Sequence, residues 1–204
     1  FVREENRQSE ALNEYSTAVA RFLNVQDILE KTVEVIREGA SVGGVYVCTR
    51  NAATGDYDAR YSDQPLNDLS FSIRADSPLV RVLHRSQCVS WRRFETTVDY
   101  KAMWDSEKNQ LRYLRVAGGV ALTGEEGDMP ALILVSEGQG KHRVSGQDMQ
   151  WMLSVASVAS IALKNAALYE QAYHEARVDD LTGLLNRKHF LQVLEEQFET
   201  TKES

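Results

Sequence analysis

The feature that most constrains this chain is a long helical pattern over roughly residues 147–178. Small and apolar side chains recur there at alternating spacings of three and four residues, which is typical of the heptad seam of a left-handed coiled coil. The members of this seam are Met152, Val155, Ala159, Ala162, Ala166, Tyr169, Tyr173 and Ala176. Two interpretations stay open, and both can hold: the seam pairs with a second copy of the chain, or the same face packs on the chain's own sheet.

The dominance of alanine sets the strength of this seam. Burial of one CH₂-sized group is worth ~0.8 kcal/mol, so each alanine adds far less than a leucine would. We therefore expect a homodimer whose seam is marginal in its C-terminal half. A weak seam has alternative registers of nearly equal energy, which suits a helix that transmits conformational signals.

Apolar periodicity predicts the elements of the remaining chain. Helix is expected over residues 1–37, with Asn24 capping its second half. A short helix is expected from Pro78 to about Arg85, and an irregular helical stretch over 95–115. Strands are expected over residues 42–50, 57–62, 69–73, 88–94, 117–122 and 129–136. This order predicts an α+β fold: an antiparallel sheet of five to six strands flanked by helices, with long N- and C-terminal signalling helices.

Charge and composition exclude several classes of function. The net charge of −7 argues against nonspecific binding to nucleic acid and against direct contact with an anionic membrane surface. Cys48 and Cys88 form no CxxC pair and the four histidines are scattered, so we expect no metal site and no cofactor. The chain begins at Phe1 and holds no apolar run of the ~20 residues that a membrane span needs. We expect a cytoplasmic piece of a longer protein, whose own membrane anchoring stays open.

Three stretches of the chain resemble the GAF family of sensory domains. They are Gln26–Glu30 with Val33 and Ile36, Ser86–Ser90, and Arg143–Asp148 followed by the alanine-rich helix up to Leu168, Tyr169 and Glu170. The resemblance implies a GAF domain over residues 23–165, preceded by a signalling and dimerisation helix over 1–22. The chain lacks the Asn-Lys-Phe-Asp-Glu signature of the members that bind cyclic nucleotides, so the resemblance leaves the small-molecule ligand unknown.

The resemblance also implies a place for a ligand pocket. GAF domains bind small molecules between the sheet and the helices over its far face. The side chains expected there are Phe71, Trp91, Trp104 and Tyr113, with Arg92, Arg93 or Arg112 as anion partner. Aromatic rings could stack on a planar ligand, and arginines could hold a phosphate or a carboxylate. The alternative is that the rings belong to the core and the arginines to a solvated edge.

Residues 179–190 resemble the opening of a bacterial GGDEF diguanylate cyclase domain. We call the residues that carry this likeness the output joint. The output joint comprises Asp179, Asp180, Leu181, Thr182, Gly183 and Asn186. The resemblance implies a coiled-coil linker helix over 166–180 and a truncated start of the GGDEF domain over 181–204. The GTP-binding loop and metal-binding aspartates of that family have no match here, so we expect no catalysis from this chain.

These patterns support three functional hypotheses. The first is a regulatory GAF domain that binds a small ligand, or dimerises, and so controls cyclic di-GMP synthesis by the downstream GGDEF domain. The second is a structural dimerisation spacer without a ligand. The third is a thiol-dependent GAF-like reductase that uses Cys88, for which the sequence offers no evident resolving thiol.

Overall fold

The computed structural model describes residues 2–63, 71–124, 127–138 and 144–177, together with residues 184, 186, 190 and 191. The chain divides into two compact units, Phe1–Lys164 and Asn165–Ser204. Within the described residues, the larger unit holds a six-stranded sheet and the helices α1 to α6, and it ends inside the last helix, α7. The α+β class and the antiparallel sheet flanked by helices are confirmed.

The predicted N-terminal helix is two helices, α1 (Val2–Val19) and α2 (Val25–Gly39). The break lies where the sequence predicts a cap: the side chain of Asn24 accepts a hydrogen bond of 2.8 Å from the backbone N–H of Gln26. The two helices pack side by side through a buried hydrogen bond of 2.6 Å between the hydroxyls of Tyr15 and Thr32. The N-terminal helix is thereby fixed to the domain by a specific polar contact as well as by apolar burial.

The sheet has the strand order β3-β2-β1-β6-β5-β4, and every neighbouring pair is antiparallel. The strands are β1 (Val42–Arg50), β2 (Tyr57–Ser62), β3 (Ser72–Ile73), β4 (Cys88–Ser90), β5 (Val116–Leu122) and β6 (Ala131–Glu137). Strand β6 is central, and its apolar run is buried on both faces, as expected of a continuous stretch of such residues. The predicted strand over 69–73 is described only from Phe71 onward, because residues 64–70 lie outside the described part of the chain.

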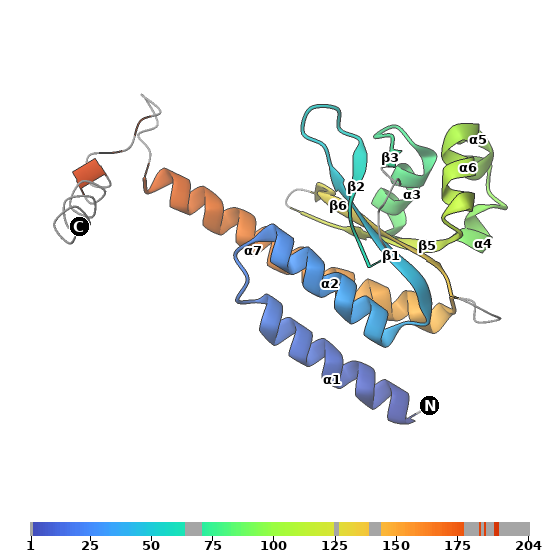
Figure 1. Cartoon of the computed structure of the whole chain (residues 1–204), viewed down its shortest axis with the longest axis horizontal. Coiled ribbons are helices and arrows are strands. Elements are labelled where there is room, and N and C mark those ends of the chain that lie inside the picture. The colour runs from blue at the N-terminus through green and yellow to red at the C-terminus, as the bar shows by residue number, and fades with distance from the viewer. Residues whose placement is uncertain are drawn as a thin grey trace, which may run out of the picture. The chain divides into compact units, whose positions relative to one another are not determined.

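Alternate residues of the central strands point to two different layers. Tyr46, Cys48, Leu132 and Leu134 belong to the core cluster that the short helices α3 to α6 cover. The residues between them, such as Val45 and Ile133, are equally buried and therefore face the opposite layer. Figure 1 shows α2 and the first part of α7 along that second face, and α3 to α6 gathered over the other.

Four short helices cover the first face: α3 (Pro78–Ser86), α4 (Trp91–Phe94), α5 (Val98–Ala102) and α6 (Asp105–Tyr113). Ser77 caps α3 by accepting a bond of 3.2 Å from the N–H of Leu79. The predicted strand over 88–94 is wrong beyond Ser90, where α4 begins. Trp91 and Phe94 are both buried, and one helical turn places residues three apart on the same face, whereas a strand would place them on opposite faces.

Helix α7 (Gly146–Glu175) is the predicted long helix. Ser145 and Asp148 cap its start reciprocally, because the Ser145 hydroxyl accepts from the Asp148 N–H and the Asp148 carboxylate accepts from the Ser145 N–H. Among the described residues, α7 is the one helix long and apolar enough to cross a membrane. Half of the most apolar window of α7 is buried inside the protein.

Candidate functional site

The aromatic residues predicted to line a pocket fall into two environments. Phe71 and Trp91 are buried in the core cluster under α3 to α6. Trp104 and Tyr113 are 55% and 75% exposed, so they lie outside that cluster. The structure therefore brings together half of the predicted aromatic set.

Within the described residues, side chains occupy the region where the resemblance implies a ligand. The rings of Trp91, Phe94 and Tyr100 pack against one another, with centroids 5.5 to 5.8 Å apart and tilted or edge-to-face planes. Each such pair contributes ~0.5–1.5 kcal/mol beyond the burial of its area. The indole N–H of Trp91 is also satisfied, because it donates to the Glu95 carboxylate at 2.9 Å. This aromatic group fills part of the interior between the sheet and α4 and α5.

Two of the predicted ligand-binding residues have partners within the chain. Arg112 donates a hydrogen bond of 2.7 Å to the Tyr100 hydroxyl and lies over the same ring. The guanidinium of Arg74 lies 5.1 Å from the centre of the Trp104 ring, a cation–π contact. Arg92 and Arg93 are both exposed on α4.

A buried carboxylate links α6 to the start of α3. Glu107 accepts 2.8 Å from the Ser77 hydroxyl and 3.3 Å from the backbone N–H of Arg74. Burial raises the pKa of Glu107 above its ordinary value, and the hydrogen bond from Ser77 partly opposes that rise. Because Ser77 also caps α3, this carboxylate holds the short helices in register with the sheet edge.

A groove lies along the free edge of β4, and we call it the β4-edge groove. Its volume is 470 Å³, within the ~300–1,000 Å³ range of small-molecule sites. The lining residues are Val82, Arg85, Cys88, Val89, Ser90, Arg93, Phe94, Thr97, Asp99, Val144, Ser145, Gly146 and Met149. They come from α3, β4, α4, α5 and the start of α7, which lie far apart in the sequence. Sequence reasoning named Cys88 and Arg93 but missed this site, since only the sheet order brings the segments together.

The two cysteines differ sharply in access. Cys48 is fully buried in β1, and burial raises the pKa of its thiol far above the ordinary range, with Asp58 adding to the rise. Cys88 lines the β4-edge groove and is partly exposed. A reagent in solution can therefore reach Cys88 but not Cys48.

The heptad seam of α7 divides into a buried and an exposed half. Met152, Val155, Ala159, Ala162 and Ala166 are at most 4% exposed in a single chain, so they are covered without any second copy. Tyr169, Tyr173 and Ala176 are exposed. A dimer through this seam would therefore use its C-terminal part.

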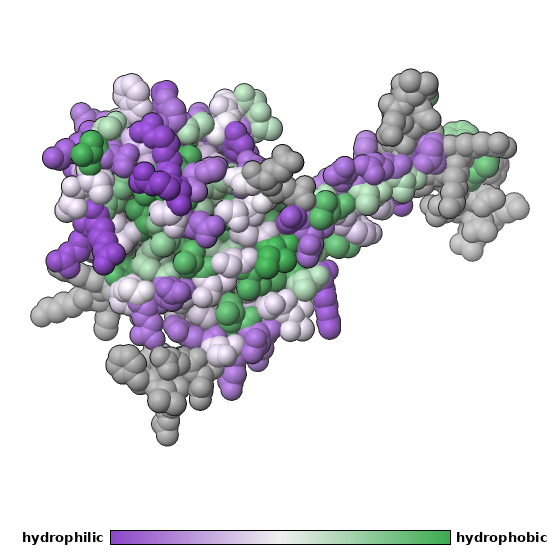
Figure 2. Space-filling model, turned by 180° about the vertical axis from the view of Figure 1, so that it is seen from behind, coloured by the Kyte–Doolittle hydropathy of each residue, from purple (hydrophilic) through white to green (hydrophobic). Residues whose placement is uncertain are grey.

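The exposed part of α7 carries aromatic and apolar side chains. The rings of Tyr169 and Tyr173 stack with centroids 6.2 Å apart, and Arg177 lies over Tyr173 at 3.7 Å. Ile161 and Leu168 add further exposed apolar surface at 63% and 43% exposure. Figure 2 shows apolar surface gathered along this helix.

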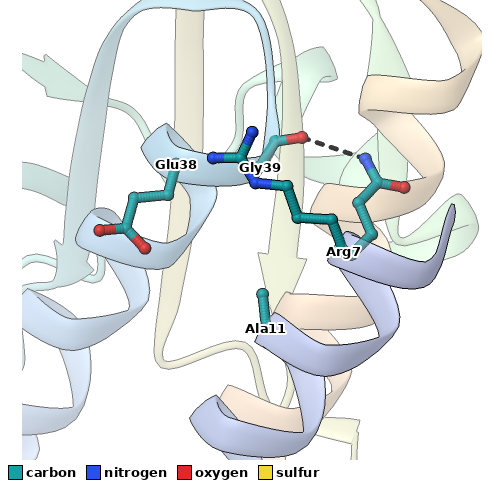
Figure 3. A pocket seen from close by; sticks show the side chains of 5 residues that line it. Arg7, Ala11, Glu38 and Gly39 are labelled. Atoms are coloured by element: carbon teal, nitrogen blue, oxygen red, sulfur yellow. Dashed lines mark hydrogen bonds between the residues drawn. The ribbon is translucent and has the colours of Figure 1, made fainter. Parts of the chain in front are cut away.

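A smaller pocket lies between α1 and the end of α2 (Figure 3). Its volume is 70 Å³, which suits a few water molecules at most. Gln8 closes one side by donating a hydrogen bond of 3.1 Å to the Gly39 carbonyl. Beneath it, the Trp151 ring occupies the space that a Cβ at position 39 would need, so this close approach requires glycine. The pocket marks tight helix packing rather than a ligand site.

The output joint is described only at Asn186, because residues 178–183 lie outside the described part of the chain. The Asn186 side chain donates 2.6 Å to the Ala176 carbonyl, and its backbone N–H donates 2.8 Å to the Arg177 carbonyl. Its own carbonyl accepts 2.9 Å from the N–H of Phe190. Asn186 therefore satisfies backbone carbonyls just past the end of α7 and also receives the first bond of the following turn.

Solved structures identify the fold, although the sequence comparisons found no relative. No family model matches this sequence, and no curated protein matches it. The GAF domain of an Acinetobacter phosphoenolpyruvate-protein phosphotransferase aligns with a TM-score of 0.58 at 16% identity, covering 80% of this chain and 96% of that one. A GAF domain/HD domain protein from Geobacter sulfurreducens gives 0.58 at 12% identity, covering 72% and 97%. The chain has a GAF fold.

The cyanobacteriochrome PixJ from Thermosynechococcus elongatus has a GAF domain of the same fold. Its blue-light-absorbing form aligns with a TM-score of 0.56 at 16% identity and covers 74% of this chain and 91% of that one. At such identities the likeness concerns the GAF fold, and ligand and activity have to be argued from this chain's own residues.

Proposed function

We propose that this chain is the regulatory GAF domain of a bacterial signalling protein, and that α7 carries its signal. The observation that carries the proposal is the division of the α7 seam. Its first half is fixed in the domain by residues such as Val155 and Ala159, and its second half leaves Tyr169, Tyr173 and Ala176 exposed. A helix whose first half is anchored in the domain and whose second half is exposed is suited to relay a change in the domain.

The output of this relay is proposed to be a GGDEF diguanylate cyclase domain that follows in the same cytoplasmic protein. The support is the resemblance of residues 179–190 to the opening of that domain. The contacts of Asn186 with the Ala176 and Arg177 carbonyls agree with a joint that couples the end of α7 to the next segment. Control of cyclic di-GMP synthesis would then depend on how two copies of α7 pair.

A structural spacer without a ligand is the second candidate, and a specific observation favours it. The aromatic group of Trp91, Phe94 and Tyr100 occupies the interior where a ligand is expected. The thiol reductase hypothesis loses support, since the chain's other cysteine, Cys48, is too deeply buried to resolve an oxidised Cys88.

Sedimentation velocity on the full chain tests the proposal. We expect a concentration-dependent dimer that Tyr169→Asp with Tyr173→Asp dissociates, because two carboxylates per helix would face each other across the seam. Ala167→Asp with Gln171→Asp places the same two charges on the opposite side of α7 and should leave the dimer intact. A chain that stays monomeric at high concentration, or a control that dissociates as fully as the seam variant, would contradict the relay.

A further inference from the structure

The β4-edge groove combines apolar walls with a charge that no ion pair offsets among the described residues. Val89, Phe94 and Met149 supply apolar surface from a strand, a short helix and α7. Gly118 makes room for this arrangement, since a Cβ there would lie 2.8 Å from the Met149 Sδ. An apolar body of modest size can therefore be buried along the strand edge.

The charges that line the groove favour an anion. Arg85 and Arg93 are its cations, and Asp99 is its one acidic residue. Arg85 lies 3.9 Å from Asp99, whereas Arg93 makes no ion pair with any carboxylate among the described residues. A free guanidinium beside apolar walls offers a bidentate donor to a carboxylate.

The start of α7 leaves one end of the groove open. Gly146 lines the groove as the first residue of a thirty-residue helix, and the space around its Cα is open. The Asp148 carboxylate caps this end of the helix by accepting from the Ser145 N–H, so it offsets the partial positive charge of the helix start. The preference for an anion therefore rests on the Arg93 guanidinium, which would repel a cationic ligand.

We infer that the β4-edge groove binds a small organic monoanion with an apolar tail, its carboxylate on Arg93 and its tail against Val89, Phe94 and Met149. This site lies at the edge of the sheet and meets the interior aromatic group through Phe94, which belongs to both. The regulatory meaning of such binding rests on the proposed function, because the groove includes the first turn of α7. The inference that the groove binds an anion depends only on the residues that line the groove.

Cys88 provides a reporter for occupancy of the groove. A neutral maleimide should label Cys88 alone, because Cys48 is fully buried. Octanoate serves as the probe, with octanol and octylammonium as matched probes of the same tail length. We expect octanoate to slow labelling saturably, octanol to do so only at higher concentration, and octylammonium to have the weakest effect.

The neighbouring arginines of α4 supply a matched pair of variants. Arg93→Gln should weaken protection by octanoate roughly tenfold, the loss expected for one charge-assisted bond. Arg92→Gln, which changes an exposed arginine outside the groove lining, should shift it by about twofold at most. Both arginines are exposed, so both variants should have the same melting temperature as the unmodified chain.

Three results would overturn the inference: no protection of Cys88 by octanoate, equal protection by octanol, or equal losses in the Arg92 and Arg93 variants. Protection of Cys88 without any change in the dimer dissociation constant would uphold the groove as a binding site and count against the proposed relay. The two failures are therefore distinguishable in one set of samples.

Discussion

The two faces of the sheet are covered in contrasting ways. One face lies under long helices that approach closely through small residues, as where Gly39 meets Trp151. The other lies under four helices of four to nine residues, joined by the aromatic group around Trp91 and by the Glu107 carboxylate. Long helices can shift as units, whereas short helices that are joined by contacts between aromatic side chains resist displacement. The relay that we propose would therefore leave through the long-helix face.

The largest effect should come from a charge placed under the long helices. Ala159 is fully buried, so Ala159→Asp leaves an uncompensated carboxylate in the core and should cost at least ~3–5 kcal/mol of unfolding free energy. Ala167→Asp puts the same charge on an exposed position of α7 and should cost within about 0.5 kcal/mol. Urea unfolding measures both. Equal costs would refute close packing on this face.

On the short-helix face, the two predicted pocket tryptophans should behave differently. Trp91→Ala opens a cavity in the aromatic group and should cost ~3–5 kcal/mol. Trp104→Ala removes a half-exposed ring and one cation–π contact, worth ~0.5–1 kcal/mol. Thermal and urea unfolding of the pair measure the difference. A mild Trp91→Ala variant that gains affinity for small molecules would show that this face is an adaptable pocket.

The Glu107 contact should give the smallest effect and a defined pH dependence. The folded chain raises the pKa of Glu107, so it binds more protons than the unfolded chain between the ordinary and the raised values. The stability from this group is present in acid and is lost as pH rises through the raised pKa. Glu107→Gln removes that loss, so the variant should gain stability relative to the unmodified chain as pH rises. Unfolding curves of both chains across this pH range measure the gain; parallel profiles would contradict the assignment.

The same contrast explains what the sequence could predict. Strands β1 and β2 match their predicted bounds, because each apolar run is bounded by turn residues such as Thr54 and Gly55. Helix α7 was equally evident from its period. The segment around α4 was misread as strand, since Cys88–Phe94 is short and apolar at spacings that fit either element.

The candidate site was less accessible to sequence reasoning for a physical reason. Heptad spacing identifies which face of α7 is apolar. Only the folded structure shows that Ala162 is buried within the chain and that Tyr173 is exposed. The β4-edge groove depends on sheet order, which places Val82 and Met149 beside the same strand edge. Local periodicity in the sequence predicts neither the burial of each seam residue nor the position of the groove.

Disulfide trapping at the end of α7 tests the central claim most directly. In a Cys88→Ser background, Ala176→Cys places a thiol on the exposed part of the seam, where a parallel dimer brings equivalent positions within bonding distance. We predict that mild oxidation converts this chain into a covalent dimer, while Gln171→Cys on the opposite side of the helix stays monomeric. Absence of cross-linking at Ala176→Cys, or equal cross-linking at both positions, would contradict the pairing of α7 on which the relay depends.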